Sequence, residues 1–455
     1  MAAPFAARLA GPAAALVDSI KATADAAGDR AQRSVRNRNS TIFFGDSITA
    51  NGWKTDGTYA ADANGSYFTG GTFARTEDYG YAAWADFLSN GAFGVLDNAG
   101  IGGNTTVDML GRVSTDVLAK LPTLIVDNGG TNDIVTNSTG EDVIARKGQL
   151  FDLYEGIGAA IIACEIIPRA AFTTTQIRQA IKVNRWLHQQ ARARKNMRVV
   201  PAAAIFADPT STVGAQLAAR LFDNTHPNNL GAFWYGKALA DAAIQLVGNP
   251  LDEFGALDIY GVWAADAIIR NNNPLMGYST GGVANTGVTG QIANGYTCSR
   301  LVGAPTVAAS IVDRPDGRGK AQRLAITFNA ANDAIEFGIP SASGTFLQNR
   351  IMQATCDIEA AASSNDVVHR MHMYNAAVIS GTTYQVTSLN QQDSTGRANL
   401  PFSSGFLRGR MKSPRLSLPD TAATGYSSQL RIYASAPGTV TIDVSLFQMR
   451  LWGKL

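Results

Sequence analysis

TIFFGDSIT, residues 41–49, is the most informative stretch of the chain. Its first four residues are apolar or β-branched, and they predict a buried strand that leads directly into the turn GDSIT. Gly45 permits a close approach of the backbone at this turn. Ser47 then stands at the carboxyl end of the strand, which is the edge where ligands bind in a parallel sheet. Ser47 is therefore a candidate for a functional side chain, although serine is also common in ordinary turns.

The surrounding residues, 39–248, alternate between apolar runs and helical patterns. Further buried strands are predicted at residues 124–126, 161–167 and 198–200. The helical patterns lie at residues 81–88, 107–118, 176–194 and 232–247. Such alternation predicts an α/β domain in which helices cover both faces of a parallel sheet.

The rest of the chain divides into three further regions. Residues 1–38 contain a helical pattern at 12–35, which predicts a helix that packs either on its own domain or against sister chains in a larger assembly. Residues 249–275 are predicted to be a linker. Residues 276–455 are rich in glycine, threonine and serine, and their short alternating runs, clearest at 439–446, predict an antiparallel β-sandwich.

The composition excludes several classes of protein. Hydrophobic residues make up 45% of the 455 residues and charged residues 16%, which is enough for packed cores in two or three domains. The net charge of +2 is too balanced for a dedicated nucleic-acid binder. With 3 cysteines, 4 histidines and no CxxC pair, neither a disulfide framework nor a metal site is expected, and no cofactor is predicted. No apolar stretch reaches the roughly 18 residues that would span a membrane.

Two further motifs follow predicted strands. NAGIGGNT, residues 98–105, could be mistaken for a dinucleotide-binding fingerprint, but Thr105 occupies the place of the third glycine. Its glycines are better explained as positions where a backbone N–H points into a site. GTND, residues 130–133, offers the carboxamide of Asn132 as a hydrogen-bond donor, although the same residues also suit an Asx turn.

The last motif, DNTHPN at residues 223–228, places an acid three residues before a histidine. The carboxylate of Asp223 can fix one ring nitrogen of His226 while the other nitrogen faces a nucleophile. A single histidine is more often structural, but only one other histidine, His188, occurs within residues 39–248. A GxSxG motif is absent from residues 39–248, so this region does not match the nucleophile-elbow hydrolases.

Taken together and in this order, the four motifs resemble those of the SGNH (GDSL-type) hydrolase family. The resemblance covers residues 39–248 and implies a flavodoxin-like three-layer α/β/α hydrolase domain. It implies that Ser47 is the nucleophile, that His226 is the general base and that Asp223 orients the histidine. The oxyanion hole implied by the resemblance consists of the backbone N–H groups of Ser47 and Gly103 and the side-chain amide of Asn132. IIPR at residues 166–169 is also similar to a Pro-Arg pair at a strand end of relatives.

The last region carries a second, less specific resemblance. NPLM at residues 273–276, with its glycine- and threonine-rich continuation to Tyr296, resembles the start of jelly-roll modules of the carbohydrate-binding type, and GTVTIDVSL at 438–446 resembles their last strand. Similar openings follow SGNH domains in phage tail proteins. The resemblance implies either a sugar-binding domain or a sandwich that only packs or mediates oligomerisation. The aromatic side chains available as a sugar platform are Tyr278, Tyr296, Tyr374, Tyr384 and Tyr426.

The resemblances predict a serine esterase that removes acetyl groups from carbohydrate. Two alternatives remain open: a lipase or thioesterase for longer acyl chains, and a receptor-binding or structural virion protein that carries an SGNH fold. The expected partners are an acetylated polysaccharide or a small ester, together with sister chains or a virion tail. Pro4, Arg8 and Pro12 interrupt the alanine-rich N-terminus, so no conventional signal peptide is predicted, and the location is left open between a virion and a cell surface.

Overall fold

The computed structural model describes residues 40–55, 58–62, 65–69, 73–170, 172–247, 273–277, 281–317, 319–344, 348–360, 367–390 and 407–453. The helix predicted at 12–35, nearly all of the predicted linker and Tyr278 lie outside the described residues. The described residues form two compact units. The first, called the α/β unit, contains residues 40–51, 80–85 and 92–247, and the second, called the two-sheet unit, contains the others.

The α/β unit is built on a parallel sheet of five strands in the order β6-β1-β7-β8-β9. The strands are β1 (Ser40–Gly45), β6 (Val95–Gly100), β7 (Leu124–Asn128), β8 (Ala160–Cys164) and β9 (Met197–Val200). Strand β1 is flanked by β6 and β7, so the carboxyl ends of these three parallel strands lie next to one another. The structure confirms the parallel sheet that the alternation of apolar runs and helical patterns predicts.

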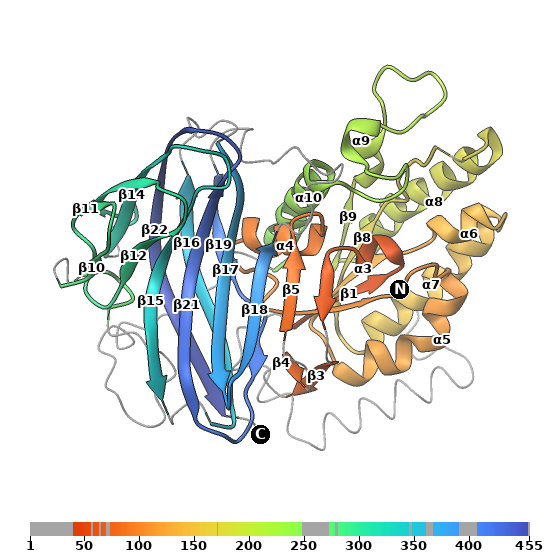
Figure 1. The fold of residues 1–455 in the computed structure, drawn as a ribbon. Coiled ribbons are helices and arrows are strands. Elements are labelled where there is room, and N and C mark those ends of the chain that lie inside the picture. Colours follow the sequence, from red (N-terminus) through yellow and green to blue (C-terminus); the bar gives the residue numbers. More distant parts are fainter. Residues whose placement is uncertain are drawn as a thin grey trace. The chain divides into compact units, whose positions relative to one another are not determined.

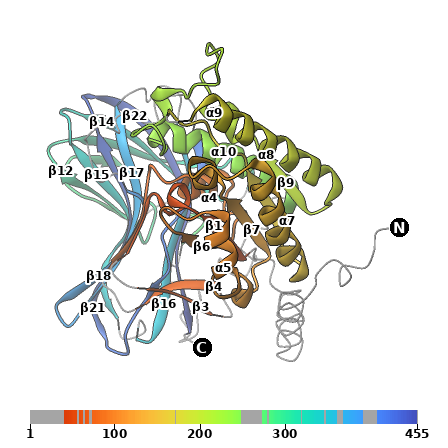
Figure 2. The same cartoon turned by 90° about the vertical axis from the view of Figure 1, so that its right-hand side faces the viewer.

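Helices cover both faces of this sheet (Figure 2). The side chains of β1 alternate between the two faces, so each face has apolar side chains that a helix can bury. Ile42 and Phe44 pack in a core with residues of α5, α7 and α8. Phe43 lies on the other face, where its ring contacts Tyr81 of α4, and Tyr81 in turn stacks on Tyr235 of α10. The helices are α3 (Ser47–Ala50), α4 (Tyr81–Leu88), α5 (Thr106–Asp116), α6 (Thr131–Val135), α7 (Gly140–Gly156), α8 (Thr174–Ala193), α9 (Ala202–Phe206) and α10 (Asn229–Val247), with 3-10 turns at Leu118–Lys120 and Ala218–Arg220.

The three helices of the first face begin at capping boxes, which satisfy N–H groups that would otherwise lack partners. The pairs are Thr105 with Asp108 at α5, Thr139 with Asp142 at α7, and Thr173 with Gln176 at α8. Among the described residues, no helix combines the length and the hydropathy that crossing a lipid bilayer requires.

The two-sheet unit consists of two β-sheets that lie face to face (Figure 1). Aromatic rings fill the space between them: Phe337 of one sheet packs against Phe447 of the other with ring centroids 6.1 Å apart. One sheet has the order β10-β12-β15-β21-β17-β18-β5-β2, and the other has the order β11-β13-β14-β22-β16-β20-β4-β3, with β19 paired to β16. The strands are β2 (Trp53–Thr55), β3 (Thr58–Asp62), β4 (Gly65–Thr69), β5 (Phe73–Glu77), β10 (Val283–Ala284), β11 (Val288–Gly290), β12 (Thr297–Val302), β13 (Thr306–Asp313), β14 (Lys320–Phe328), β15 (Ala334–Gly344), β16 (Arg350–Ala360), β17 (Val368–Ile379), β18 (Thr382–Asn390), β19 (Leu407–Lys412), β20 (Leu416–Ser417), β21 (Ala423–Ala434) and β22 (Gly438–Gly453).

Two segments lie in a different unit from the one that the sequence ranges suggest. Residues 52–79 and 86–91 fall within the predicted hydrolase range 39–248, yet they belong to the two-sheet unit, and the longer segment, 52–79, is an insertion. Strand β5 pairs with β18, and β4 pairs with β20, so this insertion contributes strands to both sheets. Strand pairing satisfies the hydrogen bonds of backbone groups that lie far apart in the sequence. The periodicity of a short stretch therefore cannot show which strands pair.

Candidate active site

The site begins where β1 ends. Gly45 is packed so closely that an added Cβ would lie 2.1 Å from the carbonyl oxygen of Asn128, so only glycine fits without displacing the neighbouring strand. Asp46 caps the short helix α3 by accepting a hydrogen bond of 2.9 Å from the backbone N–H of Ile48. Ser47 is the first residue of α3, at the carboxyl edge of the sheet.

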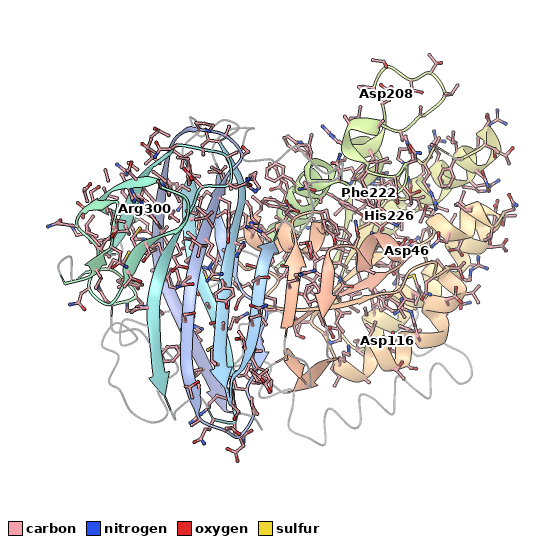
Figure 3. The ribbon with its side chains drawn as sticks, viewed as in Figure 1. Asp46, Asp116, Asp208, Phe222, His226 and Arg300 are labelled. Atoms are coloured by element: carbon pink, nitrogen blue, oxygen red, sulfur yellow. The ribbon has the colours of Figure 1, made fainter. Side chains whose placement is uncertain are left out.

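His226 lies beside this serine. Its Nε2 atom is 2.8 Å from Oγ of Ser47, and its Nδ1 atom is 2.7 Å from Oδ2 of Asp223. The ring of Phe222 stacks on the imidazole with centroids 5.7 Å apart, and Figure 3 shows the two side chains next to each other. Burial alone would raise the pKa of the Asp223 carboxyl, but hydrogen bonds from the backbone N–H and the imidazole of His226 outweigh it and lower that pKa.

The predicted oxyanion-hole residues follow the two strands that flank β1. Gly103 comes after β6 and adopts a φ of 80°, which favours glycine, and an added Cβ on its neighbour Gly102 would lie 3.9 Å from Cβ of Ser47. Asn132 comes after β7, in α6, and its Nδ2 atom donates to the carbonyl oxygen of Asn104 at 3.0 Å. The structure thus brings the loop of Gly103 and the side chain of Asn132 to the same sheet edge as Ser47.

A buried carboxylate joins the two segments that carry the predicted oxyanion-hole residues Gly103 and Asn132. Asp133 accepts hydrogen bonds from the backbone N–H of Thr106 at 2.8 Å and from its hydroxyl at 2.5 Å. Arg146 also donates to Asp133, at 3.0 Å. These bonds fix the start of α6, which carries Asn132, against the start of α5, which follows Gly103.

Arg112 is a residue of the candidate site that the sequence patterns do not single out. Its guanidinium donates to the carbonyl oxygens of Gly45 and Ala99, each at 2.8 Å, and to Oδ1 of Asn104 at 2.7 Å. It lies over the ring of Phe44 and pairs with Asp116 on its own helix. Arg112 therefore connects the strand before Ser47 with the loop that carries Gly103. An arginine in a solvent-facing helix pattern gives no sequence signal of this role.

Asp46 is a buried acid directly before Ser47 in the chain. Burial raises its pKa to about 7, against the lowering effect of the Ile48 N–H bond and of the positive charges on Lys147 and Arg169. Among the described residues its Oδ2 atom has no hydrogen-bond partner. The folded state therefore favours the protonated form of this carboxyl.

The Asp46→Asn variant is expected to have a flatter dependence of stability on pH. An acid whose pKa rises from 3.8 when unfolded to about 7 when folded stabilises the fold most at low pH, and this contribution is lost as the pH rises through that window. Asparagine keeps the helix cap but cannot ionise. The slope of the free energy of unfolding against pH should therefore be smaller in this variant by up to about 1.4 kcal/mol per pH unit. Urea unfolding between about pH 5 and about pH 7 measures both slopes. Parallel curves for the two proteins would contradict the assignment.

The Asp223→Ala variant is expected to lose ester hydrolysis, but by at least about 10-fold less than a variant without Ser47. The carboxylate fixes the tautomer of His226, and without it the imidazole is still held against the ring of Phe222. Steady-state kinetics of the two variants side by side provide the measurement. If both variants lost the same fraction of activity, the stacking on Phe222 would not orient the imidazole of His226.

No metal site accompanies these residues in the part of the chain that the structure describes: nowhere in it do three His, Cys, Asp or Glu side chains come together as ligands.

Comparisons with known proteins give one family match and several similar solved structures. Residues 43–232 match the model of the GDSL-like Lipase/Acylhydrolase family. Among solved structures, a GDSL-like lipase from Bacteroides thetaiotaomicron is 19% identical over 46% of this chain and 88% of that chain, with a TM-score of 0.34. A catalytic mutant of an acetylxylan esterase from Geobacillus stearothermophilus is 22% identical over 46% of this chain and 94% of that chain, with a TM-score of 0.35. No curated protein matches the chain. The family match and the five-stranded parallel sheet together identify a GDSL-like hydrolase domain in residues 43–232.

Proposed function

We propose that this protein is a serine esterase that removes acyl groups, with acetyl as the preferred group, from carbohydrate. The observation that carries the proposal is the hydrogen-bonded chain from Ser47 through His226 to Asp223, with contacts of 2.8 and 2.7 Å. A nucleophile, a base and an orienting acid in hydrogen-bond reach of one another are what acyl transfer through a covalent intermediate requires.

The reaction follows from this geometry. Nε2 of His226 takes the proton of Ser47 as Oγ attacks the ester carbonyl carbon, and the carbonyl oxygen becomes an oxyanion. The backbone N–H groups of Ser47 and Gly103 and the amide of Asn132 receive this charge. His226 then gives the proton to the departing alcohol, which leaves an acyl-serine. Water attacks that ester with His226 as the base, the acid departs and Ser47 regains its proton.

The proposal that the substrate is a carbohydrate requires that the two-sheet unit binds the glycan. Of the predicted platform residues, Tyr296 and Tyr426 are buried, so they cannot serve. Tyr374 and Tyr384 are half-buried, and the guanidinium of Arg431 lies 3.8 Å from the ring centre of Tyr374. Tyr384 is therefore the described aromatic residue best placed to stack on a sugar ring.

A second candidate function is hydrolysis of esters with longer acyl chains. Two apolar side chains next to the catalytic residues are exposed: Ile101, in the loop before Gly103, is 45% exposed and Phe222, which stacks on His226, is 39% exposed. Exposed apolar surface beside a nucleophile favours an alkyl chain.

Hydrolysis of p-nitrophenyl acetate and p-nitrophenyl octanoate, measured side by side with a Ser47→Ala control, tests both functions. Serine-dependent turnover of acetate with little octanoate activity supports the acetylesterase, and release of acetate from acetylated xylan would extend it to glycans. A preference for octanoate supports the second function. Absence of serine-dependent turnover on all three substrates would contradict both.

A further inference from the structure

Arg169 lies beside the candidate oxyanion hole, and the reaction described above does not use it. It follows β8 in the stretch 166–169, and its guanidinium lies 6.0 Å from the ring centre of Phe172. Its Nη1 atom donates to Oδ1 of Asn132 at 3.4 Å, which is a long hydrogen bond. The side chain is half-buried, and it follows β8 at the same edge of the sheet as Ser47 and Asn132.

The contact matters because the amide of Asn132 has two unlike ends. Nδ2 can donate to an oxyanion and Oδ1 can only accept, so the amide supports the reaction in one of its two orientations. A guanidinium carries donors alone, so it attracts Oδ1 and repels the N–H groups. The carbonyl oxygen of Asn104, 3.0 Å from Nδ2, favours the same orientation from the other end.

We propose that Arg169 is a positioning residue that fixes the amide of Asn132 in the orientation that presents Nδ2 to the oxyanion. The proposal rests on the proposed esterase function. In this arrangement the side chain of Asn132 contacts the substrate, and Arg169 affects the reaction only through its contact with Asn132.

The surroundings of Arg169 leave its guanidinium available for this role. Among the described residues it forms no ion pair, and the carboxylates that act on it electrostatically are those of Asp46 and Asp223. Its Nε atom is buried and, within the described part of the chain, has no hydrogen-bond partner. The side chain is thus held near the site by packing and by the field of two acids, and the amide of Asn132 is its one side-chain hydrogen-bond partner among the described residues.

A double-mutant cycle between Arg169→Met and Asn132→Ala tests the proposal in the full chain. Arg169→Met alone is expected to lower kcat for p-nitrophenyl acetate by about 10- to 100-fold, within the loss expected for the donor itself, while KM changes little because the effect belongs to the transition state. In the Asn132→Ala background the same change should lower kcat by less than about 3-fold, since nothing is left to orient. Arg169→Lys, which keeps donors and charge, should lose less than Arg169→Met.

Arg185→Met is the matched control, because Arg185 is an exposed arginine of α8, and its kcat should stay at the wild-type value. Thermal unfolding of each variant separates misfolding from loss of function. Equal losses from Arg169→Met in the two backgrounds would overturn the positioning role while leaving the esterase intact. Failure of the proposed function has a different signature, because wild-type protein would then show no Ser47-dependent turnover at all.

Discussion

Replacing Ser47 with alanine is expected to abolish ester hydrolysis, with kcat/KM falling by at least about 10⁴-fold. Among the described residues, Oγ of Ser47 is the hydroxyl that lies 2.8 Å from Nε2 of His226, and without it the imidazole has no serine oxygen to deprotonate and no acyl-enzyme forms. The loss should exceed that of any other single substitution at the site. Initial rates on p-nitrophenyl acetate provide the measurement.

The matched control is Ser114→Ala, because Ser114 is a half-exposed serine on α5. This variant should hydrolyse the substrate at the wild-type rate and should react with a fluorophosphonate probe, whereas Ser47→Ala should not react. Residual serine-independent hydrolysis at the wild-type level in Ser47→Ala would remove Ser47 from the mechanism.

The sheet and the position of its functional edge could be predicted because both depend on local patterns. The run 41–44 is apolar enough for a strand that helices cover on both faces, and the structure buries Phe43 and Phe44 completely. The helix predicted at 81–88 has the bounds of α4. The three-residue spacing of Asp223 and His226 suits a turn in which both side chains point the same way, and the structure places them in contact.

The parts that could not be predicted depend on contacts between distant residues. Two strands of 52–79 pair with partners more than 300 residues away: β5 with β18, and β4 with β20. Helix α7 buries Lys147 against Asp127, and this ion pair interrupts its apolar pattern. Arg112 and Arg169 gain their roles only from the carbonyl and amide oxygens that the fold brings to them.

Other sequence expectations stay predictions. The jelly-roll identity of the two-sheet unit, sugar binding by it, and association with sister chains or a virion tail depend on topological comparison, ligands or partners. Binding of acetylated and deacetylated xylan by the full chain would address the second of these directly. Tyr296 and Tyr426 are buried, so they are excluded as side chains that contact the sugar.

Replacing Asn132 with alanine is expected to lower kcat by about 10²–10³-fold while the protein stays folded. The reason is that Nδ2 of Asn132 is the one side-chain donor that we assign to the oxyanion, and the two backbone donors remain after the change. Asn132 is half-buried at the start of a short helix, and the bonds that anchor this segment come from its neighbour Asp133. The mutation should therefore remove charge stabilisation without releasing α6.

The Asn132→Asp variant separates the loss of the donor from the loss of packing. Aspartate has the shape of asparagine and can still accept from Arg169, but it offers no N–H and places a negative charge beside the developing oxyanion. We therefore expect Asn132→Asp to be slower than Asn132→Ala, with both variants unfolding at temperatures close to that of the wild type. Packing alone would give the reverse order, because the isosteric variant would then be the faster one. The order of the two rates thus decides whether Asn132 acts through its N–H group, and with it whether the polar edge formed by β1, β6 and β7 stabilises a negative charge.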